Sequence, residues 1–170
     1  MRRWLALLLL VCLLLFTTHY EVLASAPGTA KYVSYGNMNY SLNCYTSGTP
    51  INGTTLNAYW YSGSSTQTWD LTSWGGSSIY ARMLSNANHN VAISYVGATH
   101  ATVNSITNDA SIQKIKLIPE GYDSNNYYRE GLANVTYLLA LTCSGYYNGA
   151  QIQWLSSNGL NNQLWVARVW

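Results

Sequence analysis

The segment Gln67-Thr68-Trp69 returns twice, as Gln113-Lys114-Ile115 and as Gln163-Leu164-Trp165, at spacings of 46 and 50 residues. A tyrosine precedes these glutamines by 35, 33 and 35 residues, at Tyr32, Tyr80 and Tyr128. Self-similarity at a period of about 20 to 50 residues is typical of folds built from repeated supersecondary units. The sequence therefore predicts a threefold internal repeat of units about 45–50 residues long, at residues 32–74, 79–120 and 128–170.

Each repeat contains short apolar runs separated by Asn, Ser, Thr and Gly, which is typical of β-strands joined by tight turns. Strands are expected at 31–35, 41–45, 55–60 and 68–71 in the first repeat, and at 127–130, 138–142, 151–155 and 164–168 in the third. Four strands in each of three repeats give twelve, and closing them removes exposed sheet edges. We therefore expect an all-β fold, a β-trefoil with pseudo-threefold symmetry, in a single domain over residues 25–170.

The predicted core takes four apolar residues from each repeat. They are Leu42, Leu56, Trp69 and Leu71, then Val91, Ile93, Ile115 and Leu117, then Leu139, Leu141, Ile152 and Trp165. Tyr59 and Trp60 are adjacent on a predicted strand, where successive side chains point to opposite faces. One of these two rings is therefore expected to face inward and the other outward.

Residues 1–24 have the features of a secretory signal peptide. Arg2 and Arg3 precede an apolar run from Leu5 to Phe16, and cleavage is expected after Ala24. The apolar run is too short to span a bilayer comfortably, which takes about 20 residues. We expect a secreted protein without a transmembrane anchor.

Cleavage leaves two cysteines, Cys44 and Cys143, in an oxidising compartment where pairing is the default expectation. A disulfide between them would close a loop of about 100 residues, which the chain-entropy model values at roughly 4 to 5 kcal/mol. It would also tie the first repeat to the third.

The ends of the first and third repeats share a further pattern. Asn52-Gly53 precedes Gln67-Thr68-Trp69, and Asn148-Gly149 precedes Gln163-Leu164-Trp165, with 15 residues from asparagine to glutamine in both. The pattern resembles the ricin B-chain type of carbohydrate-binding β-trefoil, whose hallmark is an Asn-Gly turn leading to Gln-x-Trp. The second repeat lacks the Asn-Gly turn, and Ile115 stands where the other two repeats have the tryptophan of Gln-x-Trp. The resemblance implies a lectin-like protein that binds a glycan or polysaccharide without a metal or cofactor.

The resemblance also implies a shallow site in which carboxylate or amide groups hold sugar hydroxyls and an aromatic ring supports the apolar sugar face. The matching residues are Asn43, Asn57, Tyr59, Thr66 and Gln67 in the first repeat, Ala92 in the second, and Ala140, Gln153, Leu155, Asn162 and Gln163 in the third. The family's aspartate is missing from every repeat, and only Asn43 keeps a polar group in its place. Each glutamine can either contact the ligand or satisfy turn backbone, the commoner role. We expect the best site in the first repeat, a structural second repeat, and a third repeat that lacks a platform unless Trp154 faces outward.

Other classes of function find little support in the composition. Residues 25–170 carry six Lys or Arg against five Asp or Glu, which is not the charge of a nucleic-acid-binding domain. The carboxylates show no convincing catalytic pair, and His89 and His100 lack partners at metal-ligand spacing. We therefore expect neither an enzyme nor a metal site.

One alternative from another class stays open, a β-trefoil that has lost sugar binding and acts as a structural or protein-interaction module, such as a toxin subunit or an inhibitor. Tyrosine is enriched at protein interfaces. Five tyrosines near predicted turns would supply such a surface, namely Tyr122, Tyr127, Tyr128, Tyr146 and Tyr147.

Overall fold

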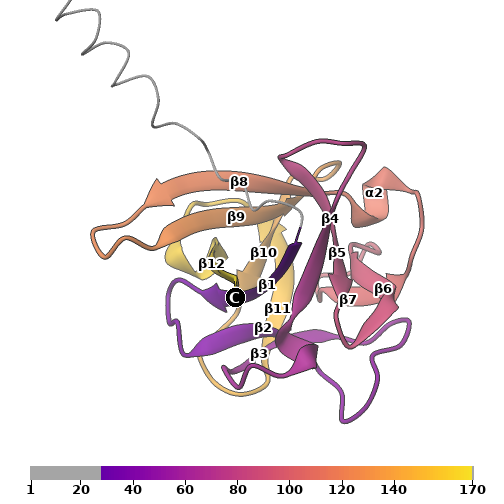
Figure 1. Ribbon diagram of the computed structural model, residues 1–170, viewed down its shortest axis with the longest axis horizontal. Helices are drawn as coiled ribbons and strands as arrows, with labels where there is room; N and C mark the ends of the chain where they lie inside the picture. Colours follow the sequence, from indigo (N-terminus) through magenta and orange to yellow (C-terminus); the bar gives the residue numbers. More distant parts are fainter. Residues whose placement is uncertain (1–27, 170) are drawn as a thin grey trace, which may run out of the picture.

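The computed structural model describes residues 28–169, which form twelve strands in three sets of four (Figure 1). The first set is β1 (Gly28–Ser34), β2 (Tyr40–Cys44), β3 (Leu56–Trp60) and β4 (Trp69–Ser73). The second is β5 (Tyr80–Ser85), β6 (Asn88–Ser94), β7 (Thr102–Ser105) and β8 (Ile115–Tyr122). The third is β9 (Tyr128–Asn134), β10 (Leu139–Cys143), β11 (Ala150–Ser156) and β12 (Leu164–Val169). The predicted all-β fold with three repeats is confirmed.

Six strands close into a barrel, because each pairs antiparallel with the next around a ring. The ring runs β1, β4, β5, β8, β9, β12 and back to β1. The other six strands form three hairpins, β2–β3, β6–β7 and β10–β11. These hairpins meet through the β3–β11 pairing and through the isolated bridges Thr55–Thr102 and His100–Gln153. Each repeat thus contributes two barrel strands and one hairpin.

One short helical turn precedes the last strand of each repeat. The turns are η1 (Ser65–Gln67), α2 (Ala110–Gln113) and η2 (Asn161–Gln163), and each ends on the repeated glutamine. The glutamine that recurs in each repeat therefore lies where the chain returns from a hairpin to the barrel.

The predicted core residues lie inside the barrel and beneath the hairpins. All are buried except Leu139, which is half-buried and packs against the core. Trp69 and Trp165 are fully buried, and each indole N–H donates to a backbone carbonyl at 3.1 Å, that of Leu42 and that of Leu141. A buried indole requires such an acceptor, so these bonds let tryptophan fill the centre of the fold.

The two cysteines do not form the expected disulfide, because both are free thiols in the structure. The Cys44 sulfur lies 3.7 Å from the Ser85 hydroxyl, whereas the Cys143 sulfur lies 2.8 Å from the carbonyl of Gly145. Burial raises the pKa of the Cys44 thiol to about 12 and also raises the pKa of Cys143. Each sulfur is buried and behaves as a small, weakly polar group, in contact with a hydroxyl or carbonyl oxygen.

The proposed signal peptide, residues 1–24, lies outside the described residues. Within residues 28–169, every helix is too short to cross a membrane.

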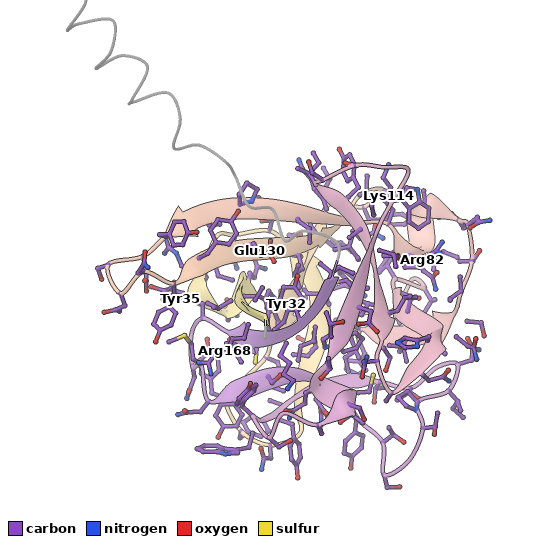
Figure 2. All side chains as sticks on the ribbon, in the orientation of Figure 1. Tyr32, Tyr35, Arg82, Lys114, Glu130 and Arg168 are labelled. Atoms are coloured by element: carbon purple, nitrogen blue, oxygen red, sulfur yellow. The ribbon has the colours of Figure 1, made fainter. Side chains whose placement is uncertain are left out.

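Among residues 28–169, five positive side chains lie over aromatic rings, and three of these cations, Arg82, Lys114 and Arg168, are labelled in Figure 2. Arg82 lies over Trp74 at 4.7 Å, Lys114 over Tyr80 at 4.3 Å, Arg129 over Tyr35 at 5.1 Å, and Arg168 and Lys31 over Tyr61 at 5.2 and 6.0 Å. A ring face attracts a cation, so tyrosine and tryptophan rings stabilise the positions of five of the six Lys and Arg side chains in residues 28–169.

Candidate functional site

A cavity of about 500 Å³ opens in the first repeat, beside the hairpin β2–β3 and the turn η1. We call it the first-repeat cavity. Three of the predicted site residues line it, Asn43 from β2, Tyr59 from β3 and Gln67 from η1. The remaining lining residues are Tyr45, Thr46, Ser47, Ser62, Ser64 and Thr66, so hydroxyl groups surround the amides and rings. Every side chain in this lining is uncharged at neutral pH, which suits a neutral polar ligand.

Neither Tyr59 nor Trp60 faces inward, although one of them was expected to, because 41% and 53% of their surfaces are exposed. β3 is buried through Ala58 and exposed over its last two residues, so both of its faces are open to solvent at this end. Trp60 lies edge-on against Tyr40 with ring centroids 5.8 Å apart. Tyr59 is therefore left to present its ring to the first-repeat cavity.

Asn43 and Asn57 stand opposite each other in the β2–β3 register, but they line different cavities. The Nδ2 of Asn43 donates to Oδ1 of Asn57 at 2.9 Å and to the carbonyl of Cys44 at 3.0 Å. The structure brings Asn43 to Tyr59, whereas Asn57 lines a neighbouring cavity of about 250 Å³. Asn57 is thus linked to the first-repeat cavity through Asn43.

Gln67 is fully buried and its amide is bonded to backbone at both ends. Its Oε1 accepts the N–H groups of Ser62 and Gly63 at 2.8 and 3.1 Å, and its Nε2 donates to the carbonyl of Trp60 at 2.8 Å. These bonds fasten the loop after β3 against η1. Gln67 therefore shapes the floor of the cavity, and its amide is engaged within the fold.

The glutamines of the other two repeats also bond backbone N–H and C=O groups of the preceding loop, which supports a structural role for the repeated glutamine. Gln113 accepts the N–H of Thr107 at 3.0 Å and donates to the carbonyl of Ser105 at 3.0 Å. Gln163 accepts the N–H of Asn158 at 2.7 Å and donates to the carbonyl of Ser156 at 2.9 Å. The glutamine spacing in the sequence thus reflects a repeated backbone bond.

The predicted site residues of the third repeat form hydrogen bonds to other groups of the protein. Trp154 is buried, and its indole donates to the carbonyl of Ser94 at 3.1 Å, so it cannot serve as an outward platform. Gln153 is half-buried and donates to Gln151 at 3.3 Å. Asn162 is also half-buried and donates to the carbonyl of Cys143 at 3.4 Å.

The strand register corrects the alignment of the third repeat. Gln153, the counterpart of Asn57, stands opposite Thr142, whereas Ala140 stands opposite Leu155. Thr142 is therefore the counterpart of Asn43, and it accepts from Nε2 of Gln163 at 3.0 Å. Leu155 remains the counterpart of Tyr59 and offers no flat ring.

The second repeat also carries a cavity, which the sequence patterns did not indicate. It measures about 470 Å³ and is lined by Tyr95, Val96, Gly97, Asp109, Ser111, Ile112 and, from the third repeat, Tyr137. Asp109 caps α2 by accepting both the backbone N–H and the hydroxyl of Ser111, and these bonds hold the pKa of the carboxyl below its usual value. A carboxylate four residues before Gln113, where the first repeat has Gly63, is the signal that could have pointed to it.

The predicted tyrosine-rich surface is only partly exposed. Tyr122, Tyr146 and Tyr147 are exposed, and Tyr122 packs on Tyr128 with centroids 5.2 Å apart. The hydroxyl of Tyr128 is buried. Tyr146 lies directly against Gly36, where any added Cβ would collide with its ring.

Comparison with solved structures identifies the architecture. A designed threefold symmetric protein, ThreeFoil, is similar over 84% of this chain and 99% of its own, with a TM-score of 0.71 and 21% identity. The chain has the β-trefoil fold. The earthworm R-type lectin C-half in complex with GalNAc matches 84% of this chain and 98% of its own, with a TM-score of 0.63 and 17% identity.

A third β-trefoil, the Macrolepiota procera ricin B-like lectin in complex with lactose, matches 84% of this chain and 96% of its own, with a TM-score of 0.59 and 15% identity. These similarities concern the fold. No protein-family model matches the sequence, and neither does any curated protein.

Proposed function

We propose that this protein is a secreted, non-enzymatic lectin that binds a neutral sugar in the first-repeat cavity. The observation that carries the proposal is the meeting of Asn43 and the exposed ring of Tyr59 in one cavity with an uncharged, hydroxyl-rich lining. A sugar needs this combination, because its hydroxyls require hydrogen-bond partners while its C–H face is apolar.

Tyr59 supplies the apolar part of the proposed site. An aromatic ring removes the C–H face of a sugar from water and restricts its orientation at low cost in side-chain entropy. Among residues 28–169, no side chain donates to Oδ1 of Asn43, which leaves this oxygen available to a sugar hydroxyl. An amide bonds a hydroxyl less strongly than a carboxylate does, so we expect modest affinity.

The similar structures add independent support for the class of ligand. The earthworm lectin holds GalNAc, and the Macrolepiota procera lectin holds lactose. By analogy with them, these two sugars are the first probes to try on this chain, although a shared fold alone does not fix a shared ligand.

A glycan array that includes GalNAc and lactose tests the proposal on the protein beginning at Ser25. Titration of the best ligand should then show that Tyr59→Ala binds at least about tenfold more weakly, since the apolar sugar face loses its cover. Asn43→Ala should weaken binding by about 1 to 2 kcal/mol. Leu155→Ala is the matched control, because Leu155 holds the same strand position in the third repeat.

Two results would reject the proposal of a sugar site in the first-repeat cavity. Either no glycan binds to the folded parent, in which case the interaction-module alternative takes its place, or Tyr59→Ala binds as the parent does, in which case the sugar lies elsewhere.

Secretion is the second part of the proposal and rests on residues 1–24. N-terminal sequencing of protein recovered from the medium of an expressing culture should begin at Ser25. Protein that stays inside the cells with residues 5–16 attached would contradict it.

A further inference from the structure

A cavity of about 250 Å³ lies where the three hairpins meet, and we call it the inter-repeat cavity. Its lining takes Thr55 and Asn57 from the first repeat, His100 from the second, and Gly149 and Gln151 from the third. The bridges Thr55–Thr102 and His100–Gln153 hold these hairpins together around it. The cavity therefore depends on the whole trefoil rather than on one repeat.

Asn57 gives this cavity an unused hydrogen-bond donor. The side chain is 96% buried, since only 4% of its surface is exposed, and its Oδ1 accepts from Asn43. Its Nδ2 is buried without any partner among the described residues. A buried N–H without an acceptor is unfavourable, so an oxygen that reached it would be favoured.

The inter-repeat cavity adjoins the first-repeat cavity. Tyr45 lines both, and the 2.9 Å bond between Asn43 and Asn57 joins their floors. Tyr45 is 64% exposed, so its ring is available to a ligand that crosses from one cavity to the other. Two polar cavities that share the exposed ring of Tyr45 fit an oligosaccharide better than a single sugar.

We propose that the inter-repeat cavity is a second subsite, which takes the next ring of an oligosaccharide whose first ring lies on Tyr59. This inference rests on the proposed function and narrows its ligand from a single sugar to an oligosaccharide of at least two rings. An oxygen of the second ring, a hydroxyl or an acetamido carbonyl, accepts from Nδ2 of Asn57. Gln151, exposed at the mouth of the cavity, bonds the outer hydroxyls.

The Nδ2 of Asn57 is covered in the free protein, so a lining side chain must shift before an oxygen of the second ring can reach it. Tyr45 lines the cavity and is 64% exposed, and an exposed side chain changes rotamer within nanoseconds.

The test compares single sugars with their two-ring relatives, using galactose with lactose, glucose with cellobiose, and N-acetylglucosamine with chitobiose. Calorimetric titration of the mature protein should give a disaccharide affinity about tenfold above that of its single ring, the gain from one further bond in a desolvated site. Asn57→Asp keeps the acceptor for Asn43 and removes the donor. It should reduce the ratio of disaccharide affinity to single-sugar affinity to less than about threefold.

Two further variants at exposed positions keep the test informative if Asn57→Asp does not fold. Gln151→Ala changes an exposed side chain and should lower the disaccharide advantage by about threefold, with single-sugar affinity intact. Asn90→Ala removes an exposed amide from β6, away from both cavities, and should change neither affinity.

The outcomes separate the two proposals. If single sugars bind in a Tyr59-dependent manner but disaccharides gain nothing, the second subsite is rejected while the lectin function stands. The subsite is equally rejected if Asn57→Asp and Gln151→Ala both keep the full disaccharide advantage. If no probe binds to the folded parent, both proposals fail.

Discussion

The first and third repeats share a scaffold but differ where a ligand would lie. Both fasten a loop with a glutamine, Gln67 or Gln163, and both bond a buried indole to a leucine carbonyl at 3.1 Å. At the counterpart positions of the hairpin, however, Tyr59 is replaced by Leu155. The comparison teaches that the Gln-x-Trp pattern specifies the fold, whereas the strand residues between its copies specify the site.

The largest expected effect tests the shared scaffold. Trp69→Ala and Trp165→Ala should each lower the free energy of unfolding by about 3 to 5 kcal/mol, because a large buried ring is lost and a cavity remains. The two losses should be similar, since the environments correspond. Chemical denaturation followed by circular dichroism measures them. If only one of the two substitutions lowered the free energy of unfolding, the two tryptophans would not be equivalent in the first and third repeats.

The next effect separates scaffold from site. Gln67→Ala and Gln163→Ala should each cost about 2 to 4 kcal/mol of stability, because buried backbone groups in the loop lose their partners. Only Gln67→Ala should also weaken sugar binding in the folded fraction, since it alone fastens the loop that carries Ser62 and Ser64. Denaturation and glycan titration of both variants decide this. Equal effects on sugar binding would contradict the division between the repeats.

A smaller effect comes from exchanging the residues that differ. Tyr59→Leu should weaken sugar binding by about 1 to 2 kcal/mol with little change in unfolding midpoint, because both side chains are exposed and apolar. Adding Leu155→Tyr should not restore binding. Thr142, the counterpart of Asn43 in the third repeat, already bonds Gln163 and has a shorter side chain than Asn43. Titration of the single and double variants checks the exchange, and recovery in the double variant would show that the ring alone makes a site.

The sequence could predict the scaffold because buried, repeated residues leave a periodic trace. The register of the glutamines located the last strand of each repeat, and Trp69 and Trp165 were expected in the core. The orientation of Tyr59 and Trp60 was not predictable, because it depends on where β3 leaves the buried part of the fold. The counterpart of Asn43 was misplaced at Ala140, since the pairing of β10 with β11 depends on hairpin length as well as on spacing.

The sequence also could not predict that Asn43 and Asn57 line two different cavities. The two residues are paired across a hairpin, and the packing of the other two repeats determines what lies beyond Asn57. The cavity beside Asp109 was not predicted, because its lining also takes Tyr137 from another repeat. Features made by contacts between repeats leave no period in the chain.

The smallest expected effect concerns two residues at which the repeats agree. Cys44 and Cys143 are buried in corresponding strands as free thiols, and burial raises the pKa of both. The thiolate is the reactive form, so neither should react with maleimide in the native protein at pH 7. Unfolding the protein that begins at Ser25, without reductant, should then give two labels per chain by mass spectrometry. An absence of labels would show that the cysteines pair after all, and the first and third repeats would be tied covalently rather than by the barrel alone.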